Sequence, residues 1–438
     1  MKKLFVVLCL CLGLGLSGCP QTPRTEAPVP QLPREQPTVK PSTVEPSTPE
    51  AKAVVALMTI MDEATGLTKN VGKWTLTPEG TIKAIVIDGQ QMSKAAMKLF
   101  GEQPDLETLQ ISNYRELNDE MVTFLKGLKK LKNLSIVNSS GITDAAVKMI
   151  VEAFPNLTTL DLSKNTNLKD GALKSISALK ELETLAINYC GFSEFGMMDV
   201  ASLPKLKSLD IRANMTVGNT GLGFLAKIPT LRSLKHRSPA VDDYGLETLT
   251  EASNLESLLM QDFNISDSAG ESLKKFEKMK ELEVFRCQGF GSVGVLVLKG
   301  MPLNRLTLRD LPSVDDSAME VFQELPTLKR LYLNELPSVS DAGLTSLSFL
   351  KELEVLDIWE VPITDKTLEV ISKLPNVKDL SIRSTQISDS GVGFMLSMPN
   401  LTHLTLKDNV DLSDAGKRRL QEKGYKKLDF GSTASSEE

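Results

Sequence analysis

The sequence contains few of the residues that build most catalytic and metal sites. Two histidines are present, His236 and His403, which excludes most zinc sites and histidine-based triads. Three of the five cysteines lie in the first twenty residues, so Cys190 and Cys287 remain in the body and no disulfide framework is indicated. Carboxylates are plentiful, but no two are singled out as an acid–base pair. We therefore expect no enzymatic activity, no metal and no cofactor.

Aromatic residues and positive charge are also scarce. Phe, Trp and Tyr make up 5% of the chain, whereas leucine dominates the apolar residues and favours a core built from leucine. The formal net charge is -6, so no overall positive charge attracts nucleic acid. We expect no nucleic-acid partner, and any basic surface has to be local.

The longest apolar run lies at the N-terminus. Two lysines precede about 13 apolar residues from Leu4 to Leu16, which is fewer than the roughly 20 that a membrane-spanning helix needs. Residues 1–19 therefore have the anatomy of a signal peptide. Its ending, LSGC, resembles the bacterial lipobox, which implies cleavage before Cys19 and lipidation of that cysteine. The alternative is an ordinary signal peptide that ends in a cysteine by chance.

A proline-rich segment follows. Residues 20–50 contain nine prolines among Thr, Ser, Glu and Gln, a composition that cannot build a core. Such a segment is a semi-rigid disordered tether that reaches at most about 95 Å when fully extended. These features predict a protein that is lipid-anchored to a membrane of the cell envelope and faces the periplasm or the cell exterior.

Beyond Lys73 one short pattern returns, with apolar residues at positions 1, 4 and 6. Clear copies begin at Leu106 (LETLQI), Leu157 (LTTLDL) and Leu328 (LKRLYL). Weaker copies, which bring the number of starts to fifteen, begin at Ile82, Leu231, Leu255, Leu282 and Leu428. Most starts are 24 to 26 residues apart, with outliers of 27 and 21. Alternation at positions 4 and 6 predicts a strand with one buried face.

A helix-start signal comes about twelve or thirteen residues after each start, as in Thr143-Asp144, Ser340-Asp341 and Thr364-Asp365. Side chains of these types accept hydrogen bonds from first-turn amides, and the carboxylate complements the helix dipole. Apolar residues then recur at helical spacing. Each repeat is thus predicted to be one strand and one helix that bury their apolar faces against neighbouring repeats.

This pattern resembles the leucine-rich repeat, and segments such as ITDAAV and VSDAGL are similar to its helix-bearing subtype of roughly 25 residues. The resemblance covers about residues 82–430 and implies an α/β solenoid: a horseshoe with a parallel β-sheet on the concave face and helices on the convex face. Similar repeats occur in F-box-type substrate receptors, but no F-box-like segment is present here. The likeness is closer to bacterial leucine-rich-repeat lipoproteins. We expect residues 51–81 to form an N-terminal cap and residues 431–438 a disordered tail.

Three features inside the array receive a structural interpretation. Cys190 and Cys287 lie four repeats apart, about 19 Å, which is too far for a disulfide. Cys287 is predicted to occupy a buried position-6 slot, and His236 the same slot of its own repeat, as a satisfied or partly exposed histidine. The GFGSVG segment at 289–294 matches a dinucleotide-binding motif. Because it is in phase with the repeats, in the shortened 21-residue unit, we interpret it as a tight turn.

Positions 3, 5 and 7 of each repeat are predicted to face outward on the concave surface. The first five repeats contain no Lys or Arg there and two acids, Asp88 and Asp161. The later repeats contain nine basic residues against three acids, which are Asp210, Asp357 and Asp379. The candidate ligand-binding residues are these basic side chains and two aromatic neighbours: Arg212, Lys235, Arg237, Arg286, Arg305, Arg309, Arg330, Arg383, Lys407, Tyr332 and Trp359.

Arginine beside exposed aromatic residues is typical of protein interfaces, although pairs of Asp and Arg across strands would neutralise much of this charge. The favoured hypothesis is a scaffold that binds a protein partner on its concave face, where the basic side chains would suit an acidic partner. Adhesion to an anionic glycan or cell-wall polymer is a second hypothesis, and a structural envelope component is a third. Charge reversal at Arg309 and Arg330 is predicted to abolish salt-sensitive capture of the ligand.

Overall fold

The structure is a computed structural model that describes residues 44–61, 68–70, 72–90, 92 and 94–431, and these belong to one compact unit. The predicted signal peptide with Cys19, the tether up to residue 43 and the tail from residue 432 lie outside the described residues. The first helix begins at Pro49, capped by the Thr48 hydroxyl, so regular structure starts two residues before the predicted boundary.

Within the described residues sixteen strands form one sheet in chain order, and every neighbouring pair is parallel except the first, β3 with β4. The strands of this sheet are β3 (Gly72–Leu76), β4 (Ile82–Asp88), β5 (Thr108–Ser112), β6 (Asn133–Val137), β7 (Thr159–Asp161), β8 (Thr184–Ala186), β9 (Ser208–Asp210), β10 (Ser233–Arg237), β11 (Ser257–Gln261), β12 (Glu281–Phe285), β13 (Arg305–Arg309), β14 (Arg330–Asn334), β15 (Val355–Trp359), β16 (Asp379–Arg383), β17 (His403–Thr405) and β18 (Lys427–Asp429).

A helical segment follows each strand from β4 to β17. The α-helices are α1 (Pro49–Leu57), α2 (Lys94–Gly101), α3 (Asp119–Val122), α4 (Asp144–Ala153), α5 (Asp170–Ile176), α6 (Gly196–Val200), α7 (Asn219–Leu225), α8 (Asp243–Leu249), α9 (Ala269–Lys274), α10 (Ser292–Val297), α11 (Asp341–Leu344), α12 (Asp365–Ser372), α13 (Val392–Ser397) and α14 (Asp414–Gln421). The 3-10 helices are η1 (Thr123–Gly127), η2 (Asp316–Glu324), η3 (Thr345–Phe349) and η4 (Asp389–Gly391).

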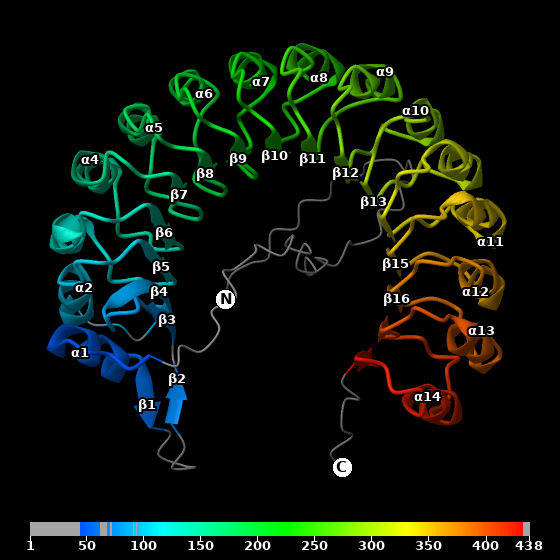
Figure 1. The fold of residues 1–438 in the computed structure, drawn as a ribbon. Coiled ribbons are helices and arrows are strands. Elements are labelled where there is room, and N and C mark those ends of the chain that lie inside the picture. The colour runs from blue at the N-terminus through cyan, green and yellow to red at the C-terminus, as the bar shows by residue number, and fades with distance from the viewer. Residues whose placement is uncertain (1–43, 62–67, 71, 91, 93, 432–438) are drawn as a thin grey trace, which may run out of the picture. The chain divides into compact units, whose positions relative to one another are not determined.

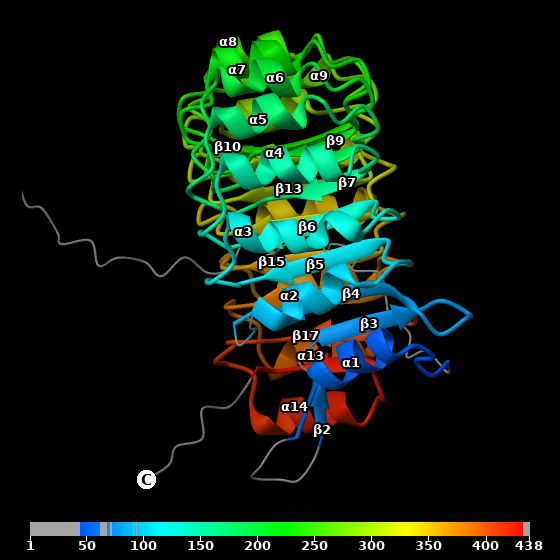
Figure 2. The same ribbon diagram turned by 90° about the vertical axis from the view of Figure 1, so that its left-hand side faces the viewer.

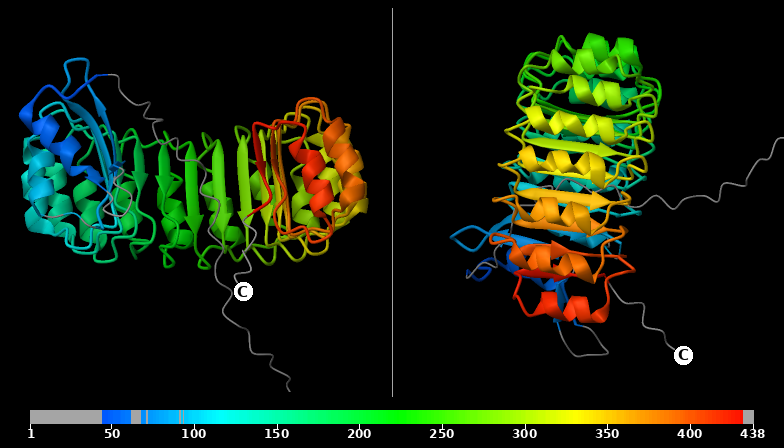
Figure 3. Two further views of the ribbon diagram at one scale, coloured as in Figure 1. Left: turned by 90° about the horizontal axis from the view of Figure 1, so that it is seen from below. Right: turned by 90° about the vertical axis from the view of Figure 1, so that its right-hand side faces the viewer.

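The repeats stack into a curved solenoid. The strands line its inner side and the helices its outer side, and from below the strands stand next to one another along the inner face (Figures 1 and 3). Leucine and isoleucine at positions 1, 4 and 6 are buried between the two layers. The predicted leucine-rich-repeat horseshoe is confirmed.

The first repeat is covered by residues that lack the repeat pattern. Helix α1 buries Val54 and Met58 in the core beside α2, and β3 pairs antiparallel with β4 through Trp74 and its neighbours. A separate two-stranded hairpin, β1 (Thr59–Met61) with β2 (Thr68–Asn70), lies at this end (Figure 2). These elements cover apolar surface that the first repeat would otherwise expose.

The register of two repeats differs from the prediction. Leu282 pairs with Leu258 on one side and with Leu306 on the other, so it occupies position 4, and its repeat begins at Met279. Leu428 likewise pairs with Leu404 and occupies position 4 of the last repeat. With these corrections no 27- or 21-residue interval remains, because methionine and tyrosine replace leucine at the two starts. In each of these two repeats the leucine at position 4 resembles the first leucine of the pattern.

The corrected register moves Cys287 from position 6 to position 9, where the chain turns away from the strand. In this turn position 8 is left-handed in twelve repeats, with φ between 49° and 62°. Both cysteines are buried at position 9, and each thiol contacts carbonyl oxygens of two repeats. Cys190 Sγ donates to Leu162 O at 3.2 Å, and Cys287 Sγ contacts Met260 O at 3.9 Å. Both thiols are free, and burial raises the pKa of each to about 12.

Aspartates at the helix starts join neighbouring repeats. Asp341 accepts hydrogen bonds from the backbone N–H of Thr364 at 2.9 Å and from its hydroxyl at 2.7 Å, and Thr364 caps the next helix. Asp365 makes the same two contacts with Ser388. The sequence predicted the hydroxyl caps, but it assigned each carboxylate to its own helix. The structure shows these carboxylates bound to the following repeat.

The glycine motif is part of this aspartate series. The Gly291 and Gly294 amides donate to Asp267 Oδ1 at 2.6 and 3.0 Å, so a carboxylate of the preceding repeat occupies the donors that a phosphate would need. A Cβ on Gly289 would lie 2.5 Å from the Ile265 carbonyl oxygen. The structural interpretation therefore holds, although the repeat unit is of ordinary length rather than shortened.

His236 occupies the predicted position 6 and is fully buried. Its Nε2 lies 2.8 Å from the Val217 carbonyl oxygen, so the proton is assigned to Nε2, and its ring packs edge-on against Phe263. Nδ1 has no hydrogen-bond partner among the described residues. Burial is the main cause that lowers the pKa of His236 to about 4, so the folded protein holds this ring neutral.

The neutral ring makes stability depend on pH. Between about pH 6.5 and pH 4 the unfolded chain binds a proton at His236 and the folded chain does not, so stability falls as the pH falls. We expect His236→Leu to reduce this loss by about 3 kcal/mol. Urea unfolding midpoints at pH 4.5, 5.5 and 7 measure the slope. Equal slopes for the variant and the wild type would assign the pH dependence to other groups.

Candidate protein-binding surface

The predicted surface residues lie on the concave side of the sheet at positions 3, 5 and 7, with one exception. Arg286 was placed on the strand, but in the corrected register it occupies position 8, the left-handed turn residue with φ 53°. Because the predicted repeat began at Leu282 instead of Met279, the prediction also left out two residues that face the concave side, Glu283 at position 5 and Phe285 at position 7. A methionine at the repeat start was the signal that could have revealed them.

Six of the nine basic side chains are bound to carboxylates of the same chain. The pairs are Arg212–Asp210 (2.7 Å), Arg237–Asp262 (2.6 Å), Arg286–Asp262, Arg309–Glu335 (3.3 Å), Arg383–Asp357 (2.8 Å) and Lys407–Asp429 (2.9 Å). Asp262 and Glu335 are position-8 residues that a count along the strands leaves out. Pairing therefore neutralises much of the predicted positive strip.

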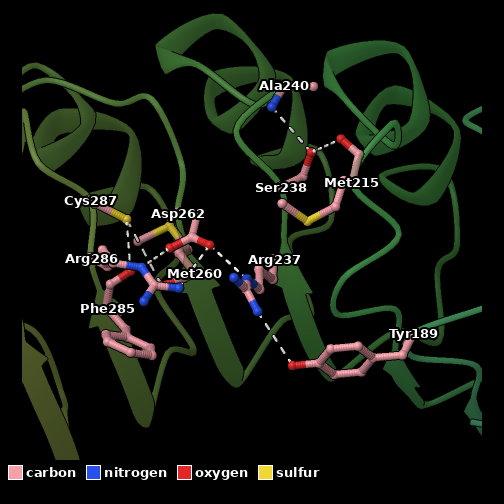
Figure 4. A network of polar contacts seen from close by, with 10 residues as sticks. All are labelled: Tyr189, Met215, Arg237, Ser238, Ala240, Met260, Asp262, Phe285, Arg286 and Cys287. Carbon is pink, nitrogen blue, oxygen red and sulfur yellow. Dashed lines mark hydrogen bonds and ion pairs between the residues drawn. The ribbon is translucent and has the colours of Figure 1, made fainter. Parts of the chain in front are cut away.

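One acid lies between two arginines at the centre of the array. Asp262 accepts from Arg237 on one side and from Arg286 on the other, and the Arg237 guanidinium also donates to the Tyr189 hydroxyl at 3.4 Å (Figure 4). Side chains from four repeats thus form one polar network. These charges stabilise the surface and are already matched.

A row of stacked side chains runs over strands β12 to β16 at position 7. The Arg309 guanidinium carbon lies 4.4 Å from the Phe285 ring centre and 5.2 Å from that of Trp359. Arg383 lies 5.2 Å from the same Trp359 ring. We call Phe285, Arg309, Trp359 and Arg383 the cation–aromatic row. Arg309 is only 3% exposed, so its guanidinium is part of the surface's framework.

Next to this row, several polar groups lack partners within the described residues. Lys235, Arg305 and Arg330 make no ion pair within 4.0 Å there, and Arg305 instead stacks on Tyr332 at 4.7 Å. Glu283 makes neither an ion pair nor a hydrogen bond with any described residue, and burial raises its pKa. The Oγ1 of Thr307 also lacks a partner. Burial is likewise the main cause that lowers the pKa of Lys235.

Two protein families match the chain. The family described as "Leucine-rich repeat region" matches residues 174–434, which is more than half of the chain, and "Leucine Rich repeat" matches residues 155–177. The chain belongs to the leucine-rich repeat proteins.

This leucine-rich repeat protein is similar to two provisionally named relatives. It is 27% identical over 288 residues to RNA-binding protein EEED8.10 of Caenorhabditis elegans, which covers 61% of this chain and 38% of the relative. It is 30% identical over 151 residues to F-box/LRR-repeat protein 23 of Arabidopsis thaliana, which covers 32% of this chain and 34% of the relative. The chain thus spans about a third of the length of the curated relatives it matches.

Two solved structures resemble this leucine-rich repeat protein in fold. A chain of the yeast Rad7–Elc1 complex superimposes with a TM-score of 0.55 at 17% identity, over 74% of this chain and 86% of that one. An internalin of Listeria monocytogenes gives a TM-score of 0.47 at 18% identity, over 87% of this chain and 95% of the other. At such identities the likeness concerns the fold.

The described part of this leucine-rich repeat protein contains no group of three or more His, Cys, Asp and Glu side chains that could hold a metal ion. His403 lies on β17 and contacts the Thr402 hydroxyl through Nδ1 at 2.9 Å. No described helix is long and apolar enough to cross a membrane. What this surface offers chemically is a stacked cation–aromatic row beside charged groups that have no internal partner.

Proposed function

We propose that this leucine-rich repeat protein is a lipid-anchored scaffold outside the cytoplasm that binds a protein partner on its concave face. The observation that carries the binding role is the cation–aromatic row, because the half-buried Trp359 ring is held in a fixed position by Arg309 and Arg383 before any partner arrives. Large side chains already fixed in place bind without much loss of rotamer entropy, which favours affinity.

Site-specific crosslinking tests the binding role. We would place a photoreactive phenylalanine at Ser381, a half-buried position on the concave strand β16, in the full chain within cells of its source organism. The matched control carries it at Lys366, an exposed residue of the convex helix α12. We expect one discrete crosslinked protein from Ser381 and none from Lys366. The same products from both positions, or none from either, would contradict a concave protein-binding face.

The anchor rests on the sequence around Cys19, and it gives an all-or-none prediction. Cys19→Ala removes the thiol that the lipobox would lipidate, so we expect incorporation of labelled palmitate to be lost and the protein to leave the membrane fraction. Ser17→Ala is the control, since it keeps the cysteine. Unchanged labelling of the Cys19 variant would refute the anchor without affecting the binding proposal.

Adhesion to an anionic glycan or cell-wall polymer is the second candidate. It is supported by Arg305 and Arg330, adjacent residues on β13 and β14 that lack acidic partners among the described residues. Such binding depends on salt, because exposed charges are screened within about 8 Å at physiological ionic strength.

A further inference from the structure

We propose that strands β12–β14 bind a segment of the partner that carries both signs of charge: a carboxylate on Arg305 and Arg330, and a basic side chain on Glu283. This inference rests on the proposed protein-binding role of the concave face and names the chemistry of the partner. It is carried by three charges of the described surface that no internal partner satisfies.

Arg305 and Arg330 form the positive half of the site. They are direct neighbours at position 3 of β13 and β14, and neither makes an ion pair with a described residue. Glu281 of β12 is the cross-strand neighbour of Arg305 but makes no ion pair with it within 4.0 Å, and the nearby Glu354 already binds Lys378 at 3.0 Å and Lys329 at 4.0 Å. Two adjacent guanidinium groups repel each other, so a carboxylate placed between them relieves this repulsion and gains charge-assisted hydrogen bonds.

Glu283 forms the negative half. It lies at position 5 of β12, directly opposite Thr307 of β13, and is half-buried without a hydrogen bond to any described residue. Burial raises the pKa of Glu283, and four cations that form no ion pair with it (Arg305, Arg212, Lys235 and Arg309) oppose this rise. The Arg305 guanidinium stacks on Tyr332 of β14, on the side away from β12. Tyr332 therefore keeps the two charges apart, and each stays open to a ligand.

The floor of the site also contains donors without acceptors. Thr307 Oγ1 lies on β13 between Arg305 and Arg309 and has no partner among the described residues. The Arg309 side chain is more than nine-tenths buried, and its Nε and Nη1 atoms lack partners too. Buried donors without acceptors are costly, so oxygen atoms of a bound ligand would stabilise this floor.

The spacing fits an extended peptide. Positions 3 and 5 lie on the same face of a strand about 7 Å apart, and neighbouring strands are about 4.8 Å apart. Glu283 is one strand from Arg305 and two strands from Arg330, so the diagonal Cα separations are about 8.5 and 12 Å. Long Glu and Lys side chains at i and i+2 of an extended peptide, whose Cα atoms are about 7 Å apart, can span these distances. A uniform polyanion fits less well, because Glu283 and Asp357 lie on this face and would repel it.

Binding of short peptides to the purified full chain tests the proposal. The probes are labelled, terminally blocked hexapeptides with Glu and Lys separated by one alanine, with Glu and alanine alternating, and with Lys and alanine alternating, together with a heparin oligosaccharide. We expect the mixed peptide to bind about ten-fold more tightly than either single-sign peptide in a fluorescence anisotropy titration.

Substitutions test whether Arg305, Arg330 and Glu283 cause the preference for the mixed peptide. Arg305→Gln with Arg330→Gln should weaken the mixed peptide about ten-fold, and Glu283→Lys should transfer the preference to the Glu peptide. Arg418→Gln, an exposed residue of the convex helix α14, is the control and should change nothing. Unchanged urea midpoints would show that the variants fold.

Three results would overturn the inference: no preference for the mixed peptide, tighter binding of heparin than of any peptide, or insensitivity to the Glu283 and Arg305–Arg330 variants. The crosslinking experiment at Ser381 separates the two proposals. If it still captures one partner while these variants bind that partner normally, the concave scaffold stands and the charge assignment fails. If it captures nothing, the scaffold proposal fails as well.

Discussion

Asn214→Ala is expected to lower the free energy of unfolding by about 4 kcal/mol. The fully buried Asn214 amide holds backbone groups of two repeats: Nδ2 donates to Ile187 O and Ile211 O at 3.0 and 2.9 Å, and Oδ1 accepts from Gly191 N and Phe192 N, both at 2.9 Å. Alanine leaves the Ile187 carbonyl and the Phe192 amide without these partners, whereas Ile211 O keeps the backbone amide of residue 214 at 3.3 Å and the exposed Gly191 amide can bind water. Because the repeats are stabilised by their neighbours, this loss weakens the interface between the fifth and sixth repeats.

Hydrogen exchange and urea unfolding of the full chain measure this loss. We expect faster amide exchange in strands β8 and β9 and a lower urea midpoint. Asn214→Cys is the matched control, since Cys190 and Cys287 fill the same position in two other repeats and donate through sulfur. It should recover part of the loss. An alanine variant with wild-type stability would show that water replaces the amide there.

Arg309→Glu is expected to destabilise the protein by about 3 kcal/mol and to disrupt the cation–aromatic row. The substitution places a carboxylate between Phe285 and Trp359, against the electron-rich ring faces, and opposite Glu335, which Arg309 now binds at 3.3 Å. Because this site is buried, neither the new charge nor the remaining Glu335 charge is well solvated.

Arg330→Glu is the comparison that distinguishes a side chain that stabilises the surface from one that contacts the partner. Arg330 is exposed and makes no ion pair with a described residue, so its reversal should change stability by less than about 0.5 kcal/mol while reducing partner capture. Urea unfolding, Trp fluorescence and crosslinking at Ser381 measure the three effects. Equal destabilisation by the two reversals would contradict the distinct roles given to them. The sequence treated both arginines as one kind of binding residue.

Some side-chain roles depend on residues that the repeat pattern does not count. Asp262 and Glu335 follow their strands at position 8, where the left-handed turn directs them to arginines of the concave face. The sequence-based prediction counted only positions 3, 5 and 7, so it included the arginines but not these acidic partners. It therefore predicted a locally positive strip, with neutralising pairs as the alternative, and the structure has mostly matched pairs.

The sequence by itself determined the solenoid, because leucine spacing and the Ser/Thr–Asp signals repeat locally in almost every unit. It also determined the number of repeats and the inward position-6 slot of His236, since period-2 alternation assigns each residue to a face. Only the tertiary structure decided which charged side chains have no partner within the described surface. Ion pairs such as Arg383–Asp357 and stacks such as Arg305–Tyr332 join residues about 25 positions apart in the chain. Side-chain direction across neighbouring strands, which no local pattern encodes, determines whether a given arginine pairs, stacks or stays available.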